Sequence, residues 1–570
     1  MNYLKELPSK MAIAFRRFPL TLVWVLFGSI YMIGLIETDA NLFRGFYAET
    51  LVLILGVSWL IGVQFFNEGF SNNLTVWVIR LLTLTGLILY YLSFPDYENS
   101  TSITFTRWFI LFISGHVLIF FAPFTRQWST LDYWNYLHRI IIAISRSALF
   151  SGIIYLGLSL ALLAIENLFS INIRDEIYAD LLVICLGIIN TFIYLSDFPT
   201  TIHQTQQLNY SKALDVLIKY ILIPIVLLYL LIVYAYSLKI LITWELPEGW
   251  VSYLITILSI TGFIIHIIIE PVREKHQDLV VNKFYPFFYL SLFPLFILLF
   301  VAIFTRLSEY NFTEKRYFLL VIALWILGIS VYVLTSKKKR LSIIAISFFA
   351  LCLLSISGPW NAFKVSINAQ GKELSRLIER TKKTDLSKEE IDRFLNISRY
   401  LKDRNKLFLI DEELGFSTDY ITSSYNSGSL ILDSIYGENN YSKSINANSN
   451  YFYFQNFRKT RVIDINGYEK FIDISLVDYP KSNYSLEVEN EYIILKNSDK
   501  QLFKYNLTQD LKRKIKLYQQ LNEAPAESFE YTIINEFGDF KLIINTMNGN
   551  IKNNEFTFNT IDGYILIKLH

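Results

Sequence analysis

The chain has 570 residues, of which 53% are hydrophobic and 16% aromatic, and its mean hydropathy is +0.36. These values exceed those of ordinary soluble globular proteins, so they exclude a purely soluble chain and indicate a membrane protein. The formal net charge of +2 lacks the basic excess that nucleic-acid binding requires, so we expect no nucleic acid among the partners.

Eleven apolar segments approach the length that crosses a bilayer, which is about 20 residues at a rise of 1.5 Å each. In chain order they are Phe18–Ile36, Ala48–Phe66, Thr75–Phe94, Trp108–Ala122, Ala148–Ile165, Ile177–Leu195, Ile218–Ser237, Trp250–Ile269, Phe284–Phe304, Tyr317–Thr335 and Leu341–Ile356. The first segment is too long for a signal-peptide core and lacks a clean cleavage site, so we interpret it as a retained anchor. The sequence therefore predicts an all-α polytopic bundle of about 11 transmembrane helices over residues 1–360, with the lipid bilayer as its partner.

The positions of Lys and Arg predict the orientation of this bundle, because basic residues in short loops accumulate on the cytoplasmic side. With a cytoplasmic N-terminus, fourteen of the loop cations fall on the cytoplasmic side and seven on the opposite side. The run Lys337–Arg340 falls on the cytoplasmic side, and one further crossing places Gly358 and everything beyond it outside. We therefore expect residues 361–570 to form a periplasmic domain.

The last 210 residues have a different composition from the first 360, since they hold 57 charged residues against 45. Ser387 and Glu390 have the spacing of a capping box, which predicts the start of a helix. Beyond it the apolar period becomes two, and Asn466-Gly467 suits a type I′ turn between two strands. The two cysteines lie in apolar runs before residue 360, so no disulfide holds this part together. We predict a soluble, strand-rich α+β domain.

Three stretches carry a family resemblance when they are taken together. They are "YAYSLKILITWELPEGWVSYLI" (Tyr234–Ile255), "RLSEYNFTEKRYFLLVIALWI" (Arg306–Ile326) and "SGPWNAFKVSINAQGKEL" (Ser357–Leu374). As a set they resemble a bacterial family of multi-pass membrane proteins catalogued as domain of unknown function 4153. The resemblance extends to about Leu407. It implies a multi-pass topology in the inner membrane of a Gram-negative bacterium, and it implies no activity and no catalytic residue.

Few polar side chains fall inside the predicted segments. His116 is the one ionisable group near the middle of a segment, and Asn190 is a comparable polar residue. Such groups either hydrogen-bond between helices, which we favour, or line a cavity. His266 and Glu270 have the i,i+4 spacing of metal ligands, but they fall at a segment end, where polar residues are expected. We therefore expect no metal and no cofactor.

Two predicted outer loops carry acidic residues. Glu37 and Asp39 lie two residues apart in the first outer loop, where they could serve metal or base chemistry. Lipid-linked sugar glycosyltransferases have a similar layout, although this loop is short for one. Glu245 and Glu248 lie in "TWELPEGWVSY", for which we favour a turn held between two interfacial tryptophans.

Functional motifs are otherwise absent from the sequence: it has no phosphate-binding P-loop, no HExxH zinc helix and no GxSxG nucleophile elbow. No catalytic residue is therefore predicted. We expect a non-enzymatic binding, sensing or scaffold protein of the inner membrane that acts through its periplasmic domain, on envelope proteins or on a second copy of itself. The alternatives are a small-molecule transporter or channel and, third, a membrane enzyme like the lipid-linked sugar glycosyltransferases.

Overall fold

The computed structural model describes residues 2–38, 45–97, 100–199, 201–203, 216–243, 250–275, 279–336, 340–418, 427–436, 451–455, 465–475, 484–489, 492–497, 500–507, 530–552 and 555–570. The chain divides into two compact units. Unit 1 comprises residues 1–383 and 396–422, and unit 2 comprises residues 384–395 and 423–570. The boundary predicted at residue 360 is of a different kind, because it divides the transmembrane part of the chain from the part in solvent. It stays a prediction.

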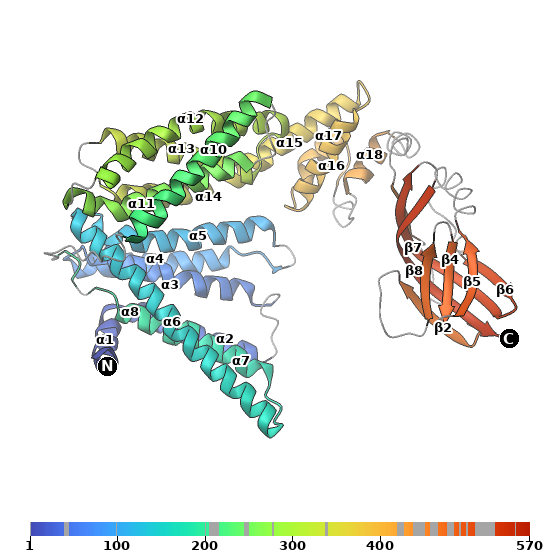
Figure 1. Ribbon diagram of the computed structural model, residues 1–570, viewed down its shortest axis with the longest axis horizontal. Helices are drawn as coiled ribbons and strands as arrows, with labels where there is room; N and C mark the ends of the chain where they lie inside the picture. The colour runs from blue at the N-terminus through green and yellow to red at the C-terminus, as the bar shows by residue number, and fades with distance from the viewer. Residues whose placement is uncertain are drawn as a thin grey trace. The chain divides into compact units, whose positions relative to one another are not determined.

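Unit 1 is built around a bundle of helices (Figure 1), most of which are apolar. They are α1 (Asn2–Arg17), α2 (Pro19–Glu37), α3 (Tyr47–Asn67), α4 (Asn73–Leu92), α5 (Ser102–Phe121), α6 (Thr130–Phe169), α7 (Asp175–Leu182), α8 (Asn190–Ser196), α10 (Ile223–Thr243), α11 (Trp250–Lys275), α12 (Leu279–Tyr310), α13 (Glu314–Thr335) and α14 (Ser342–Ile356). A π-helix, η3 (Val183–Ile189), joins α7 to α8, and a second, η4 (Leu217–Leu222), leads into α10.

Ten helical stretches of the described chain are long and apolar enough to cross a membrane. They correspond to the first ten predicted segments, so the prediction of a multi-pass membrane bundle is confirmed. The eleventh segment is α14, an apolar helix of 15 residues that is about 22 Å long, against a hydrocarbon thickness of about 30 Å. By contrast, α6 has 40 residues and extends far beyond its predicted span.

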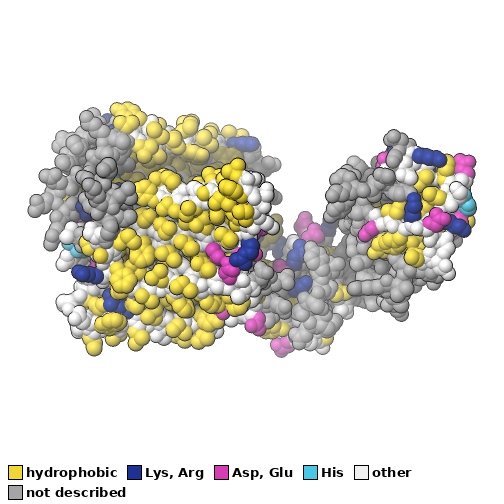
Figure 2. All heavy atoms as spheres, turned by 90° about the horizontal axis from the view of Figure 1, so that it is seen from below, with side chains coloured by type: hydrophobic (Ala, Val, Ile, Leu, Met, Phe, Trp, Pro, Cys, Tyr) yellow, Lys and Arg dark blue, Asp and Glu magenta, His cyan; other side chains and the backbone are white. Residues whose placement is uncertain are grey.

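The surface of unit 1 is apolar, as a lipid-facing surface must be. Hydrophobic side chains cover much of the face shown in Figure 2. Leu81, Leu231 and Ile297 are 65%, 67% and 70% exposed on three different helices. Large apolar patches are unfavourable in water, whereas hydrocarbon solvates them.

Small residues let α3 pack closely against its neighbours. A Cβ atom at Gly56 would lie 2.5 Å from the ring of Trp24 on α2, and one at Gly62 would lie 2.7 Å from Leu118 on α5. Such small-residue contacts are typical of membrane helices, which gain no hydrophobic driving force from each other. The Trp24 Nε1–H group donates to the carbonyl oxygen of Leu53 at 2.9 Å, which satisfies the indole at this contact.

Helices that follow the bundle are fastened to one of its ends. They are α15 (Ala362–Thr381), α16 (Lys388–Lys402) and α17 (Asp411–Leu414). Gln370 Nε2 donates to the carbonyl oxygens of Tyr310 and Phe312, at 3.0 and 2.8 Å, in the connection between α12 and α13. Residues 361–383 therefore belong to the same compact unit as the bundle.

A buried ion pair makes a second fastening. Arg404 Nε donates to Glu314 Oε1 at 2.8 Å, and Tyr400 OH donates to the same oxygen at 2.9 Å. The Arg404 and Glu314 side chains are only 14% and 11% exposed. Burial, and then the Glu314 carboxylate, raise the pKa of Tyr400, so this phenol stays protonated and donates.

The capping box predicted at the start of α16 is confirmed. The Ser387 N–H group donates to Glu390 Oε2 at 3.0 Å, and the Glu390 N–H group donates to Ser387 Oγ at 3.3 Å. This exchange satisfies two backbone donors that the first helical turn would otherwise leave unpaired.

Besides the first part of α16, unit 2 contains a helix and two antiparallel sheets. Its elements are α18 (Ser427–Tyr436), β1 (Tyr451–Gln455), β2 (Lys470–Ser475), β3 (Tyr484–Glu489), β4 (Tyr492–Asn497), β5 (Lys500–Asn506), β6 (Glu530–Asn535), β7 (Gly538–Lys552) and β8 (Glu555–Leu569). One sheet has the order β1-β7-β8-β2, with β6 also paired to β7, and the other has the order β3-β4-β5.

The two sheets of unit 2 share one apolar core. Ile493 and Phe503 from the smaller sheet lie in the same buried cluster as Phe540, Leu542 and Ile565 from the larger sheet. Each of these side chains is at most 3% exposed. Antiparallel sheets that face each other across such a core form a sandwich. The predicted strand-rich α+β character of the C-terminal part is confirmed.

A turn is present at the position predicted for the hairpin, but its type differs from the predicted type I′. Gly467 has a φ of 87°, and the Tyr468 N–H group donates to the carbonyl oxygen of Ile465 at 3.1 Å, so a four-residue turn is present. A type I′ turn needs positive φ at both central residues, and Asn466 does not have it. The pattern is that of a type II turn. Residues 461–464, which would form the preceding strand, lie outside the described residues.

The ion pair of Glu314 predicts a measurable loss of local stability when it is broken. Replacing Glu314 by Gln leaves the largely buried Arg404 guanidinium without its counter-charge, which costs about 3 kcal/mol. Hydrogen exchange on the full chain in detergent should show roughly 100-fold lower protection of the backbone amides of residues 396–402.

The matched control for this variant is Arg376→Gln. Arg376 pairs with Glu373 on α15 at 3.1 Å, but its side chain is 65% exposed. Exposed pairs contribute at most about 1 kcal/mol, so protection should change less than about fivefold. Equal effects of the two variants would contradict the assigned fastening role.

Candidate functional site

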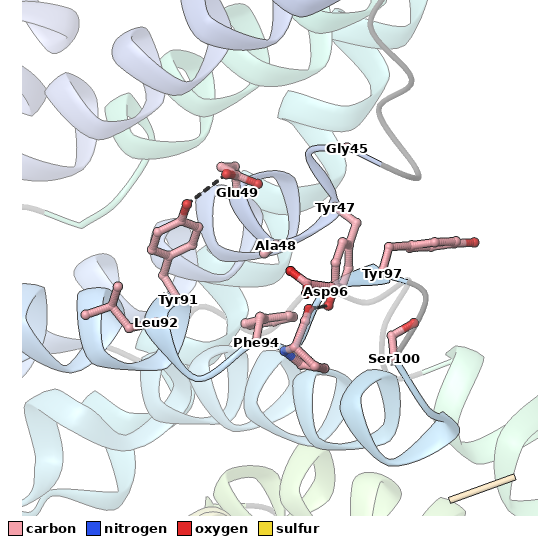
Figure 3. Close-up of a pocket in the computed structure, with 11 residues that line it drawn as sticks. Gly45, Tyr47, Ala48, Glu49, Tyr91, Leu92, Phe94, Asp96, Tyr97 and Ser100 are labelled. Carbon is pink, nitrogen blue, oxygen red and sulfur yellow. Dashed lines mark hydrogen bonds between the residues drawn. The ribbon is translucent and has the colours of Figure 1, made fainter. Parts of the chain in front are cut away.

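A pocket of about 840 Å³ opens between the start of α3 and the end of α4 (Figure 3). Glu49 enters it from the first turn of α3, where a carboxylate is favoured by the helix dipole. Helix α4 ends at Leu92, shortly before Pro95, and the following segment brings Asp96 and Tyr97 to the other wall. The pocket therefore forms where two helix ends and one loop meet.

Phenol groups surround the acidic residues of this pocket. Tyr91 OH donates to Glu49 Oε1 at 2.8 Å, which is the dashed bond in Figure 3. Tyr47 OH donates to the carbonyl oxygen of Pro95, and the Tyr47 side chain is buried. With Asp96 this lining offers carboxylates and aromatic faces, which suit a cationic group.

Sequence reasoning missed this pocket. The signal available was the gathering of Glu49, Asp96 and Tyr97 at the ends of predicted segments, but residues at segment ends are usually polar anyway. Only the packing of α3 beside α4 shows that these ends lie together.

His116 and Asn190 line one common pocket of about 470 Å³ that is open at the surface of the bundle, and His116 is exposed. It lies between α2, α3, α5 and the η3–α8 segment, and most of its lining is apolar. His116 Nδ1 lies 2.8 Å from the carbonyl oxygen of Phe112 in its own helix, and Ser151 Oγ of α6 donates to Asn190 Oδ1 at 3.3 Å. Asn190 thus makes an interhelical hydrogen bond, whereas His116 bonds within α5.

A π-helix leads directly into Asn190. Residues Val183–Ile189 adopt this rare form, which widens the helix by one residue per turn and frequently marks functional positions. In this chain the π-helix sets the direction in which the backbone continues into α8, which begins at Asn190.

The acidic residues predicted in the outer loops are only partly described. Glu37, at the end of α2, accepts two hydrogen bonds from Arg174 Nη2, both at 3.0 Å. Hydrogen bonding to Glu37 and its charge raise the pKa of Arg174. Glu37 is therefore engaged in an ion pair that joins α2 to the start of α7. Asp39, Glu245 and Glu248 lie outside the described residues.

His266 and Glu270 belong to a buried polar network. Their side chains are each 4% exposed, and His266 Nε2 lies 3.1 Å from Glu270 Oε2. His266 Nδ1 lies 3.0 Å from Tyr289 OH on α12, and Tyr285 OH donates to the Val333 carbonyl oxygen of α13 at 2.7 Å. His266 thus connects α11 to α12, and Tyr285 connects α12 to α13. Within the described residues, no three His, Cys, Asp or Glu side chains gather as metal ligands would.

Comparisons with known proteins identify relatives of the membrane part. The model of a family described as Domain of unknown function (DUF4153) matches residues 20–396. The uncharacterized protein PM1469 of Pasteurella multocida (strain Pm70) is 26% identical to this chain over 356 residues. That alignment covers 62% of this chain and 57% of the relative, so this chain spans little more than half of the relative's length. No solved structure shows a significant match.

The hydrogen bond of His116 within α5 predicts tolerance to substitution. In His116→Gln the fold should stay intact, because among the described residues this imidazole bonds to a carbonyl oxygen of its own helix and to no other helix. Thermal unfolding of the purified protein in detergent should shift by less than about 2 °C, which corresponds to a few tenths of a kcal/mol.

Gly115→Val supplies the matched control on the preceding residue. A Cβ atom at Gly115 would overlap Ser58 Oγ and approach the Trp59 ring to 2.8 Å, so this variant should lose stability strongly through overpacking. A large loss for His116→Gln would show instead that the cavity wall depends on the imidazole.

Proposed function

This chain belongs to the family described as Domain of unknown function (DUF4153), and we propose that it is a non-enzymatic binding or sensing protein of the bacterial inner membrane. It acts through its C-terminal domain on envelope proteins or on a second copy of itself. The observation that carries the proposal is the sandwich core of unit 2, in which two sheets bury a common set of side chains. A part of the chain with its own core presents a fixed surface, which recognition of a partner requires.

The extent of the family match supports the same proposal. The match ends at residue 396, so all the strands from β1 onward lie beyond it. The membrane helices from α2 onward lie within the matched residues, whereas the sandwich lies beyond them. We therefore assign the specificity of this chain to the sandwich.

The proposed orientation has a cytoplasmic N-terminus and a periplasmic C-terminal domain. Tertiary contacts at the two ends of α14 support a full crossing despite its length of 15 residues. Arg340, before α14, lies 5.9 Å from the ring of Trp128, close to the start of α6. After α14, the carbonyl oxygen of Trp360 accepts a hydrogen bond at 2.8 Å from Tyr317, near the start of α13. Since α13 ends at Thr335, shortly before Arg340, residues 340 and 360 belong to opposite ends of α13.

Reporter fusions test this orientation. A fusion after Arg340 should be active only as a cytoplasmic reporter, and a fusion after Trp360 only as a periplasmic one. A fusion after Phe70, between α3 and α4, provides the control for the cytoplasmic side. If the fusions after Arg340 and Trp360 report the same compartment, α14 does not cross and the C-terminal domain lies in the cytoplasm.

Crosslinking tests the proposed function. Envelope proteins, or a second copy of the chain, should be captured by the full protein and lost when residues 423–570 are removed. Membrane levels of the two forms must be equal, because loss of the bundle would abolish capture for a trivial reason. Capture that persists unchanged after the deletion contradicts action through this domain.

A small-molecule transporter or channel is the second candidate. The observation that favours it is the open pocket that His116 and Asn190 line between helices of the bundle, next to a π-helix. Helix α12 also contains Pro286 and Pro294, which interrupt its backbone hydrogen bonding. The glycosyltransferase alternative has less support, because Glu37 is engaged by Arg174.

A further inference from the structure

A pocket of about 360 Å³ lies where α1 and α6 meet the end of α8. Its described lining includes four cationic side chains and one carboxylate, those of Lys10, Arg17, Arg139, Arg146 and Asp197. Like charges repel one another, even in water, so an excess of cations around one pocket makes it attractive to an anion.

Two of these cations are held in position by carboxylates. Arg17 donates to both carboxylate oxygens of Glu68, through Nε at 2.6 Å and Nη2 at 2.7 Å. Arg146 Nη1 donates to Asp197 Oδ2 at 2.8 Å, and the Asp197 side chain is only 4% exposed. Arg139 is exposed, and no carboxylate of the described residues pairs with it. With respect to the described residues, its guanidinium N–H groups are therefore available to a ligand.

The pocket also has apolar walls on a surface that belongs to the membrane part. Ile13 of α1 and Ile142 of α6 line it and are 47% and 37% exposed. Ile141, which is 54% exposed, lies beside them in the sequence. The neighbouring helix α2 and the helix that ends with α8 are both among the candidate membrane spans. The pocket thus places cations next to a surface that hydrocarbon covers.

We propose that this pocket binds the phosphate-bearing headgroup of an anionic phospholipid. Guanidinium groups match phosphate oxygens with two parallel hydrogen bonds, and Arg139 offers such a fork. The apolar walls accommodate the start of the acyl chains, whereas a free phosphate ion would leave these walls uncovered. In the orientation proposed above, the pocket faces the cytoplasmic leaflet, where anionic lipids attract basic residues. The lipid site does not depend on the role proposed for the C-terminal domain.

Binding of fluorescent phosphatidylglycerol to the purified full chain in phosphatidylcholine nanodiscs tests the proposal. Binding should saturate, and unlabelled phosphatidylglycerol should displace the probe. The double variant Lys10→Gln with Arg139→Gln should raise the Kd about 30-fold, since each cation near an anionic lipid contributes about a factor of five. Arg139→Lys should recover only part of the affinity, because it keeps the charge and loses the planar fork.

Arg340→Gln is the matched control, because it removes one charge at the same end of the bundle and outside the pocket. It should leave the Kd unchanged, whereas Arg139→Gln alone should raise it about fivefold. An equal effect of these single variants would show general surface attraction and would overturn the proposal. Displacement of the probe by inorganic phosphate at the same concentration as by phosphatidylglycerol would assign the pocket to free phosphate and would also overturn it. Each variant is compared after its melting temperature is shown to match that of the natural chain.

Discussion

Inside a bilayer no water is present to pair with backbone or side-chain polar groups, and this constraint governs the larger unit of the structure. Helices satisfy the hydrogen bonding of the backbone, and several serine side chains and one histidine of the bundle follow the same rule. Ser237, Ser259 and Ser330 each donate to the carbonyl oxygen four residues earlier, at 2.6 to 2.8 Å. His266 is satisfied by Glu270 and by a tyrosine of the next helix. Polar residues can therefore occupy the bundle without defining an active site.

The same constraint explains why charged and hydrogen-bonding side chains gather at the ends of the bundle. At one end Gln370 and Glu314 fasten the following helices, and the pocket of Figure 3 gathers carboxylates and phenols. At the end where α8 finishes, cations gather around a smaller pocket. Charges that would be costly in hydrocarbon become available at these boundaries, where headgroups and water solvate them.

Unit 2 is stabilised by a different principle. Its two sheets bury apolar side chains such as Phe540 and Ile565 in a common core, which is the arrangement of a sandwich. Two stabilising principles thus operate in one chain, and the family match covers the membrane helices from α2 onward, α15 and the first part of α16, but none of the strands.

The sequence by itself determined the features that depend on neighbouring residues. Apolar runs of about 20 residues predicted ten spans correctly, and the Ser387–Glu390 spacing predicted a cap, because both are local properties. Only the tertiary structure decided which faces meet. It brought His116 and Asn190 to one cavity and Arg139 to a basic pocket, through contacts such as that of Gly56 with Trp24. Helix packing depends on shape complementarity between residues far apart in the chain, and the hydropathy of a segment does not predict this complementarity.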